Sequence, residues 1–461
     1  MSSVIIFVTP TPLKIEGGQR LDELLDANNL KAATNQLKIN ASSIEMTKDR
    51  MLGVFDAIEE RTINAEENDI NKRTSDQTQI NLGAMEYPPI SPARMEMTEM
   101  YKALKSTGNL EVYGAASDGN YPALGSKQVS PNMLEKITDL SMVSLTPQPT
   151  NSLLFAGGAL AVLEVILSLT TGINLNFLVF FTLFLAFLDK LLVNGAVFET
   201  AVRLSNREYS KKILKHEAGH FLCAYLLGCP VEGYVLSSWA ALSDPRFGGR
   251  RTTVSAGTSF FDPDLSDEIN GRRPLSRSSI DRYSIIVMGG IAAEALNFGR
   301  ADGGAGDESA LVAFLGNLNP RGGAAVTWDI GSIKNQARWG ALQAVLLLRE
   351  YKVCYDALVD ALERGGTLGE CVYAIETAAK ENGMPSIREK PLGYILDKGL
   401  EGEWMTSLPS SNETNDNKKI SENSVGSSDE SSFENDVVSL EELKKQMKDR
   451  LQDIESKLDS L

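Results

Sequence analysis

The chain has 461 residues, which is more than one ordinary domain contains, and a formal net charge of −16. This acidic balance argues against nucleic acid as a partner, because phosphate backbones attract basic surfaces. The four cysteines show no paired C-x-x-C spacing. They therefore indicate neither a disulfide framework nor a zinc finger, and they suit a reducing compartment.

Residues 1–150 are predicted to form a polar N-terminal region. Short amphipathic stretches occur at 20–38 and 51–60, and no motif among them carries chemistry. The nearest approach to a phosphate-binding loop, GNYPALGSK at 119–127, has the wrong spacing for G-x-x-x-x-G-K-[ST]. The region thus gives no sign of its role, and the sequence contains no recognisable ATPase motif.

Two long apolar runs follow, at 152–171 and 175–193. Each is long enough to cross a hydrocarbon core of about 30 Å at about 1.5 Å per residue. The only charged residues in them are Glu164, Asp189 and Lys190. We therefore expect a two-helix transmembrane hairpin rather than a pair of buried helices in a soluble protein.

A hairpin places both of its flanks on the same side of the membrane. A basic cluster follows it directly, made up of Arg203, Arg207, Lys211, Lys212 and Lys215. By the positive-inside tendency, we expect the next domain to face the cytosol, stroma or matrix.

Both histidines of the chain lie in one stretch, His216-Glu217-Ala218-Gly219-His220, which matches the zinc-peptidase signature H-E-x-x-H. The surrounding run, residues 213–227, has no proline and has apolar residues at helical spacing, which predicts a helix. Residues four apart share a helix face, so His216 and His220 can bind one metal ion while Glu217 reaches the attacking water. The alternative is a chance pair of histidines in an amphipathic helix. Cys223 is on the same face, where a buried apolar role is favoured over a thiolate ligand.

Two protein ligands are too few, because a catalytic zinc site usually has three and leaves one position to water. With no third histidine, the remaining ligand must be a carboxylate or a cysteine. Residues 289–315 supply four acidic candidates, namely Glu294, Asp302, Asp307 and Glu308.

These motifs resemble the peptidase domain of FtsH-type membrane proteases, over about 205–385. That family follows HEAGH with GGRAAE, FG and a GA-x-ND helix start, where this chain has GGIAAE at 289–294, FG at 298–299 and GAGDE at 304–308. Isoleucine stands at 291 in place of the family's arginine.

In the family, the aspartate of the final Asn-Asp pair is the third zinc ligand. Counting without gaps assigns that position to Glu308, whereas chemical identity favours Asp307. We keep both, with a slight preference for Glu308. Glu294 is expected to orient a ligand imidazole.

The resemblance implies a mainly α membrane protein, in which the hairpin precedes a mostly helical, zincin-type peptidase domain. Short β-prone runs at 231–255 are expected to supply a small β edge for an extended substrate. Two further helices are predicted at 334–364 and 368–382. The implied activity is that of a zinc metalloendopeptidase (Zn²⁺ as cofactor) acting on membrane or unfolded proteins.

The same resemblance implies oligomers with copies of itself or with FtsH-type subunits that carry an ATPase. It also implies a plastid location, in the thylakoid or envelope, because ATPase-free members of this kind occur in plants and algae. Three other readings stay open: a silent scaffold subunit, a site-2-type intramembrane protease, and a structural zinc site closed by Cys223.

The C-terminal part has two predicted segments. Residues 409–436, rich in Ser, Asn, Asp and Glu, are predicted to form a disordered acidic linker. Residues 437–461 carry apolar residues at three- and four-residue steps, which indicates a coiled-coil-like docking helix or a solvated single helix.

Overall fold

Helices make up most of the structure, which confirms the mainly α class. The computed structural model describes residues 12–41, 44–75, 91–117, 128–147, 152–247, 256–318 and 328–388, and all of these belong to one compact unit. The predicted linker at 409–436 and the predicted helix at 437–461 lie outside the described residues.

Among the described residues, five helices precede the apolar runs: α1 (Pro12–Asp26), α2 (Leu30–Ile39), α3 (Lys48–Ser75), α4 (Pro92–Ser106) and α5 (Pro131–Thr138). The starts of α4 and α5 are encoded locally, because Ser91 and Ser130 accept a hydrogen bond from the backbone N–H three residues on and a proline follows each serine. Phe55 and Tyr101 of this part are fully buried in the same hydrophobic core as Phe221. The polar N-terminal region is thus built into the core of the later helices.

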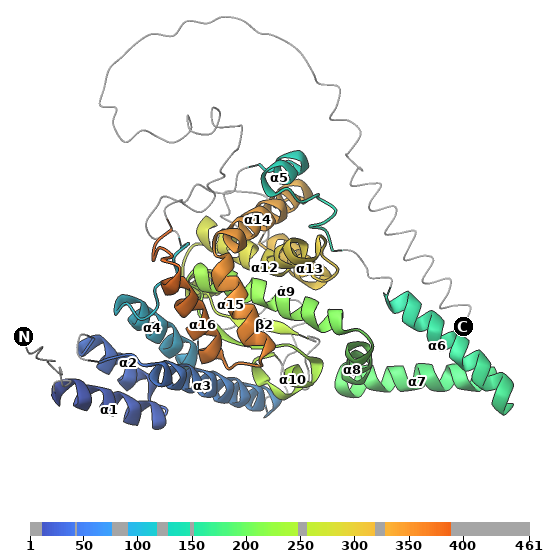
Figure 1. Ribbon diagram of the computed structural model, residues 1–461, viewed down its shortest axis with the longest axis horizontal. Coiled ribbons are helices and arrows are strands. Elements are labelled where there is room, and N and C mark those ends of the chain that lie inside the picture. Colours follow the sequence, from blue (N-terminus) through green and yellow to red (C-terminus); the bar gives the residue numbers. More distant parts are fainter. Residues whose placement is uncertain are drawn as a thin grey trace, which may run out of the picture. The chain divides into compact units, whose positions relative to one another are not determined.

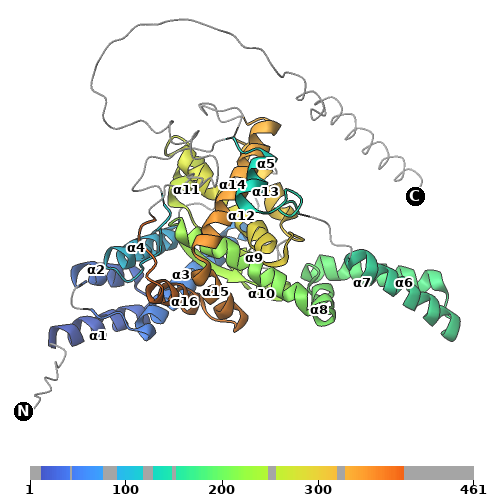
Figure 2. The ribbon, with the colours of Figure 1, turned by 45° about the horizontal axis from the view of Figure 1, so that its top comes forward.

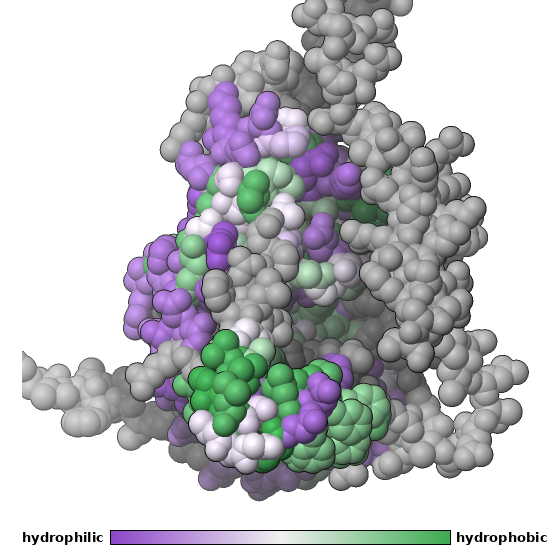
Figure 3. All heavy atoms as spheres, turned by 90° about the vertical axis from the view of Figure 1, so that its right-hand side faces the viewer, coloured by the Kyte–Doolittle hydropathy of each residue, from purple (hydrophilic) through white to green (hydrophobic). Residues whose placement is uncertain are grey.

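Next come α6 (Ser152–Thr171) and α7 (Leu175–Val193), which begin and end at the predicted residues and pack against each other. Within the described part of the chain, only α7 is long and apolar enough to cross a membrane by length and composition. The described part of α6 contributes a shorter apolar stretch, Leu160–Thr171. Most of the large hydrophobic side chains whose burial is described in these two helices are exposed, and Figure 3 shows this hydrophobic surface.

The middle of the chain contains α8 (Ala196–Ser205), α9 (Arg207–Leu226), α10 (Ser238–Ser243), α11 (Pro263–Ile269), α12 (Arg277–Phe298) and α13 (Ala305–Gly316). A short antiparallel pair, β1 (Val231–Val235) and β2 (Gly257–Phe260), forms the sheet of the described residues. The predicted β-prone stretch therefore contains β1 but stops just before β2.

Three helices form the centre of the fold, because α12 packs along α9 on one side and along α14 (Ile330–Glu350) on the other (Figures 1 and 2). α12 is buried on both faces. Ile285 and Ile286 belong to the main core, whereas Val287 and Ile291 belong to a second hydrophobic cluster shared with α13. Its middle run, residues 285–293, is free of polar side chains, as expected for such a central position.

The prediction of one continuous helix at 334–364 is wrong, because the helix is broken at Tyr351 into α14 and α15 (Lys352–Glu363). Tyr351 has φ −100° and ψ 34°, outside the helical region, and its side chain is fully buried. Neither proline nor glycine marks this break. The last predicted helix is confirmed as α16 (Leu368–Glu381). It begins with a reciprocal capping box between Thr367 and Glu370.

Candidate metal centre

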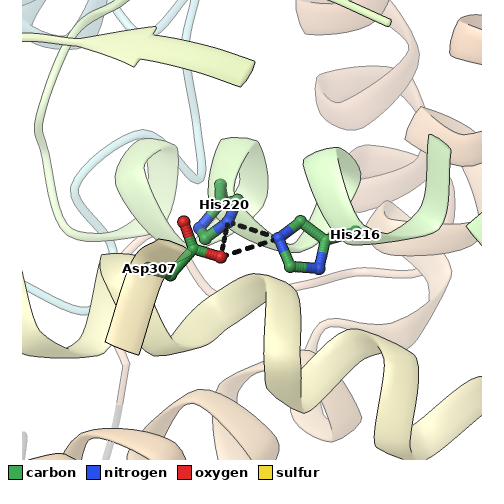
Figure 4. A group of neighbouring side chains, drawn as sticks. All are labelled: His216, His220 and Asp307. Atoms are coloured by element: carbon green, nitrogen blue, oxygen red, sulfur yellow. Dashed lines mark hydrogen bonds and ion pairs between the residues drawn. The ribbon is translucent and has the colours of Figure 1, made fainter. Parts of the chain in front are cut away.

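α9 brings His216 and His220 together on one face, one turn apart (Figure 4). The helix begins at Asn206, whose side chain accepts a hydrogen bond from the Glu208 N–H. It ends before Gly228, whose φ of +77° suits only glycine well. The two Nε2 atoms lie 3.0 Å apart, and both side chains are buried.

Asp307 is the carboxylate that joins the two histidines. Its Oδ2 lies 2.9 Å from His216 Nε2 and 3.4 Å from His220 Nε2 (Figure 4). It stands in the first turn of α13, which starts after Gly304, a residue with φ +88°.

This geometry favours Asp307 over Glu308 as the third candidate ligand. Consecutive helical residues point about 100° apart, so only one of the pair can face α9. Asp307 belongs to the His-His-Asp group that could hold a metal ion, whereas Glu308 is exposed to solvent and outside it.

Hydrogen bonds on the far side of each ring orient the two imidazoles. His216 Nδ1 lies 2.7 Å from Glu294 Oε1, and His220 Nδ1 lies 2.7 Å from the Ile286 carbonyl. A carbonyl oxygen can only accept a hydrogen bond, so Nδ1 of His220 carries a proton. Nδ1 of His216 likewise donates to the Glu294 carboxylate. The Nε2 atoms of both rings are therefore directed at the shared space.

Glu294 also holds the turn that leads to Asp307. Its Oε2 accepts the backbone N–H groups of Asp302 and Gly303 at 2.8 and 3.0 Å. Asp302 in turn forms an ion pair with Lys212 of α9. One carboxylate thus couples the orientation of His216 to the position of α13.

Glu217 lies next to the two histidines with its carboxylate buried. Its Oε2 accepts a hydrogen bond of 3.0 Å from the Thr258 hydroxyl of β2. Burial raises the pKa of Glu217, and carboxylates with a raised pKa are common among groups that transfer protons. Thr258 was not predicted as a site residue, because it lies some forty positions away in a segment with no motif.

Gly290 leaves the space in which an ion would fit. A Cβ on this residue would lie 2.4 Å from His216 Nε2 and 2.5 Å from His220 Nε2. Ligand atoms bound tetrahedrally to zinc at about 2.0–2.1 Å stand roughly 3.3 Å apart. The spacings among the three candidate ligand atoms, 2.9–3.4 Å, are close to that value, so the group could hold a metal ion of this size.

The charges of the site also favour a cation. Burial opposes protonation of His216, but its hydrogen bonds to Asp307 and Glu294 outweigh this and raise its pKa to about 10. Burial likewise opposes ionisation of Asp307, yet the nearby histidines hold its pKa well below the usual range. Three carboxylates thus surround two imidazoles, and a divalent cation would balance their charge.

Cys223 is not part of this group. It is fully buried, and burial raises the pKa of its thiol to about 12. Its Sγ packs close to Gly289 of α12, where an added Cβ would lie 3.1 Å away. A closed structural site with Cys223 as fourth ligand is therefore not favoured.

The site thus combines two imidazoles, one ligand carboxylate and one adjacent buried carboxylate. These four side chains come from two segments about 90 residues apart, and Thr258 adds a third segment. Comparisons of the chain with protein-family models, with curated proteins and with solved structures find no match.

Proposed function

We propose that this protein is a membrane-anchored zinc metalloendopeptidase that hydrolyses peptide bonds in membrane or unfolded proteins. One observation carries the proposal: Asp307 meets both histidines of the HEAGH stretch while Glu217 lies beside them. Hydrogen bonds to Nδ1 that turn both Nε2 atoms toward one point are typical of metal sites, where such bonds orient the ligand histidines.

His216, His220 and Asp307 would hold the zinc ion. A bound zinc would polarise the scissile carbonyl and lower the pKa of the attacking water. Three protein ligands leave one position free for these reactants, as catalytic sites require.

Glu217 is the proposed general base. It would accept the proton of the attacking water and deliver it to the leaving amine nitrogen. The Thr258 hydroxyl donates to one of its oxygens, which fixes the carboxylate in position and leaves the other oxygen for the water.

β2 is the proposed substrate edge. In the described part of the chain the sheet has only two strands, so β2 pairs with β1 on one side and has a second edge without a strand partner. An extended peptide that pairs with this edge would pass beside Glu217, because Thr258 belongs to the same strand.

For the rest of the molecule, the proposal follows the resemblance to FtsH-type proteases. The domain would have their zincin-type fold, and α6 and α7 would form a transmembrane hairpin, for which the apolar length of α7 is the support. The site would face the cytosolic or stromal side, in a plastid membrane by resemblance alone. FtsH-type subunits with an ATPase would be partners that unfold substrates.

An intramembrane protease of the site-2 type is less well supported. Its H-E-x-x-H helix would have to lie in the membrane, whereas α9 carries Lys211, Lys212 and Lys215 and is not among the described helices apolar enough to span. The scaffold reading has no observation in its favour, because a scaffold has no need of a buried carboxylate beside the metal ligands.

The adjacent residues Asp307 and Glu308 provide a matched test. We expect Asp307→Ala to lose zinc and cleavage of an unfolded protein such as casein, because it removes a ligand. Glu308→Ala removes an exposed carboxylate of the same turn and should keep both. Zinc content by atomic emission and casein cleavage in detergent measure the outcome. Full zinc occupancy and full cleavage in Asp307→Ala would refute the assigned site.

A further inference from the structure

α8 has an unusual distribution of side chains, with apolar residues outside and charged residues inside. Leu204 is 83% exposed, and Val197 and Phe198 are 57% and 48% exposed. Val197 and Leu204 are seven residues apart and therefore lie on the same face. Glu199, in contrast, is only 7% exposed. A soluble surface helix shows the opposite pattern.

The charged face of α8 is bonded to the domain, which fixes the rotation of the helix. Glu199 Oε2 accepts the backbone N–H of Ser238 at 2.7 Å, and Glu199 Oε1 accepts Arg203 Nε at 2.7 Å. Arg203 also donates to the Leu236 carbonyl. The helix cannot turn its apolar face inward without breaking these bonds.

Trp239 of α10 extends the apolar face. Its side chain is 47% exposed, and its Nε1 donates to the Thr200 hydroxyl of α8 at 3.0 Å. A tryptophan with a satisfied N–H and an exposed ring is typical of the boundary between membrane and water.

This face begins where the apolar helix α7 ends. Only Asn194 and Gly195 separate α7 from α8, a connection that spans at most about 10 Å. Asp189 near the end of α7 accepts the backbone N–H groups of Val197 and Phe198 at 3.1 and 2.9 Å. α8 is thus tied directly to the end of α7.

We propose that α8 and Trp239 form a membrane-docking surface that lies in the interfacial layer of the bilayer, on the side of the metal site. An amphipathic helix with exposed Leu, Phe and Trp side chains binds this layer through its apolar face. This proposal presupposes the membrane span of the proposed function. Asn206 alone separates α8 from the metal-binding helix α9, so docking would fix the metal site relative to the membrane.

Site-directed spin labels can test this surface on the full chain in nanodiscs of phosphatidylcholine and phosphatidylglycerol. The four native cysteines are buried, which keeps background labelling low. Leu204→Cys reports on α8, Leu183→Cys on the middle of α7, and Lys380→Cys on an exposed position of α16. Val197→Cys places a second label on the same face of α8 as Leu204, as an independent measurement of its environment.

We expect the labels at Leu204 and Val197 to be relaxed by oxygen and protected from a water-soluble nickel chelate, as lipid contact requires. The label at Lys380 should show the reverse. Equal exposure of Leu204 and Lys380 to the chelate, with Leu183 in lipid, would overturn the docking surface and leave the span intact. A label at Leu183 in water would overturn both.

A second copy of the chain is the competing occupant of this face. It would protect the label at Leu204 from oxygen and chelate alike, and it would produce dipolar coupling between labels on two copies. That result would overturn the membrane assignment of the surface without affecting the peptidase proposal.

Discussion

Glycines set how closely α12 approaches the two histidines. A Cβ on Gly219 would lie 2.4 Å from the Gly289 carbonyl oxygen, so the two helices touch through their backbones at this point. One residue later, Gly290 faces the ring nitrogens of His216 and His220. The G-G pair of the GGIAAE motif therefore has a steric explanation that does not depend on any resemblance.

Gly290→Ala should abolish zinc binding, because the added methyl group would occupy the space among the ligand atoms. Gly306→Ala is the matched control, since a Cβ there meets nothing within 4 Å. Zinc content and the circular dichroism spectrum of both variants provide the measurement. Normal zinc occupancy in a folded Gly290→Ala variant would show that the ion binds elsewhere.

Glu294 should control zinc affinity without being a ligand. Glu294→Ala removes the acceptor for His216 Nδ1 and for the turn at Asp302 and Gly303. Loss of such a partner typically weakens metal binding about 10–100-fold. Competition with a chromophoric chelator measures this change, with Glu308→Ala as the control. An unchanged affinity would mean that His216 is oriented by packing alone.

At the scale of elements, a buried ion pair joins the N-terminal helices to the sheet. Arg94 Nε of α4 lies 2.6 Å from Glu232 Oε1 of β1, and both side chains are buried. Glu232 also accepts the Ser259 hydroxyl of β2 at 2.7 Å. The proposed substrate strand is therefore linked through Glu232 to the N-terminal region.

Arg94→Met should destabilise the fold by about 3–5 kcal/mol, because it leaves the Glu232 carboxylate buried without its charged partner. Lys38→Met is the control. It breaks a pair with Glu99 in which both side chains are 43% exposed, so its cost should stay below about 1 kcal/mol. Urea unfolding in detergent, followed by tryptophan fluorescence, compares the two. Equal changes in the free energy of unfolding would show that the buried pair contributes no more to stability than the exposed pair.

The sequence predicts those elements well whose signals are local. α6, α7 and α16 are found at or within a residue of their predicted bounds, because apolar runs and a capping box mark them. The break at Tyr351 is missed because burial of an aromatic side chain, rather than a local stop signal, accompanies it. Tertiary packing overrides helical periodicity at this position.

The candidate site shows the same limit. The sequence predicts the roles of His216, Glu217 and His220, because these residues lie on one helix and the four-residue spacing puts both histidines on the same face. The choice between Asp307 and Glu308 depends on how the turn at residues 299–304 sets the rotation of α13, which residue counting cannot supply. Chemical identity agrees with the observed rotation, because Asp307 Oδ2 lies 2.9 Å and 3.4 Å from the Nε2 atoms of His216 and His220.

For the whole molecule, the main outcome is that the N-terminal region belongs to the site's scaffold. The segment after α4 lies against the end of α9, which carries the candidate ligands His216 and His220. Here Gly114 and Ala116 donate their N–H groups to the Tyr225 and Leu226 carbonyls at 2.9 Å. These carbonyls belong to the last turn of α9, where the Tyr225 carbonyl also accepts the Gly228 N–H at 3.1 Å. The N-terminal region thus helps to satisfy the carbonyl groups at the end of this helix. Composition alone gives no hint of this role.

The central claim is that a carboxylate beside a zinc site performs peptide hydrolysis in this fold. Substitution of Glu217 tests it most directly, because Glu217 lies beside the ligand group and is not a member of it. Glu208→Gln, at an exposed position of the same helix, is the control.

The deciding measurement is casein cleavage per bound zinc, by wild type, Glu217→Gln and Glu208→Gln purified with their apolar helices. We predict about one zinc per chain in all three, with cleavage lost only in Glu217→Gln. Cleavage by Glu217→Gln at the wild-type rate would contradict its role as base. Zinc without cleavage in the wild type would contradict a peptidase that acts without a partner.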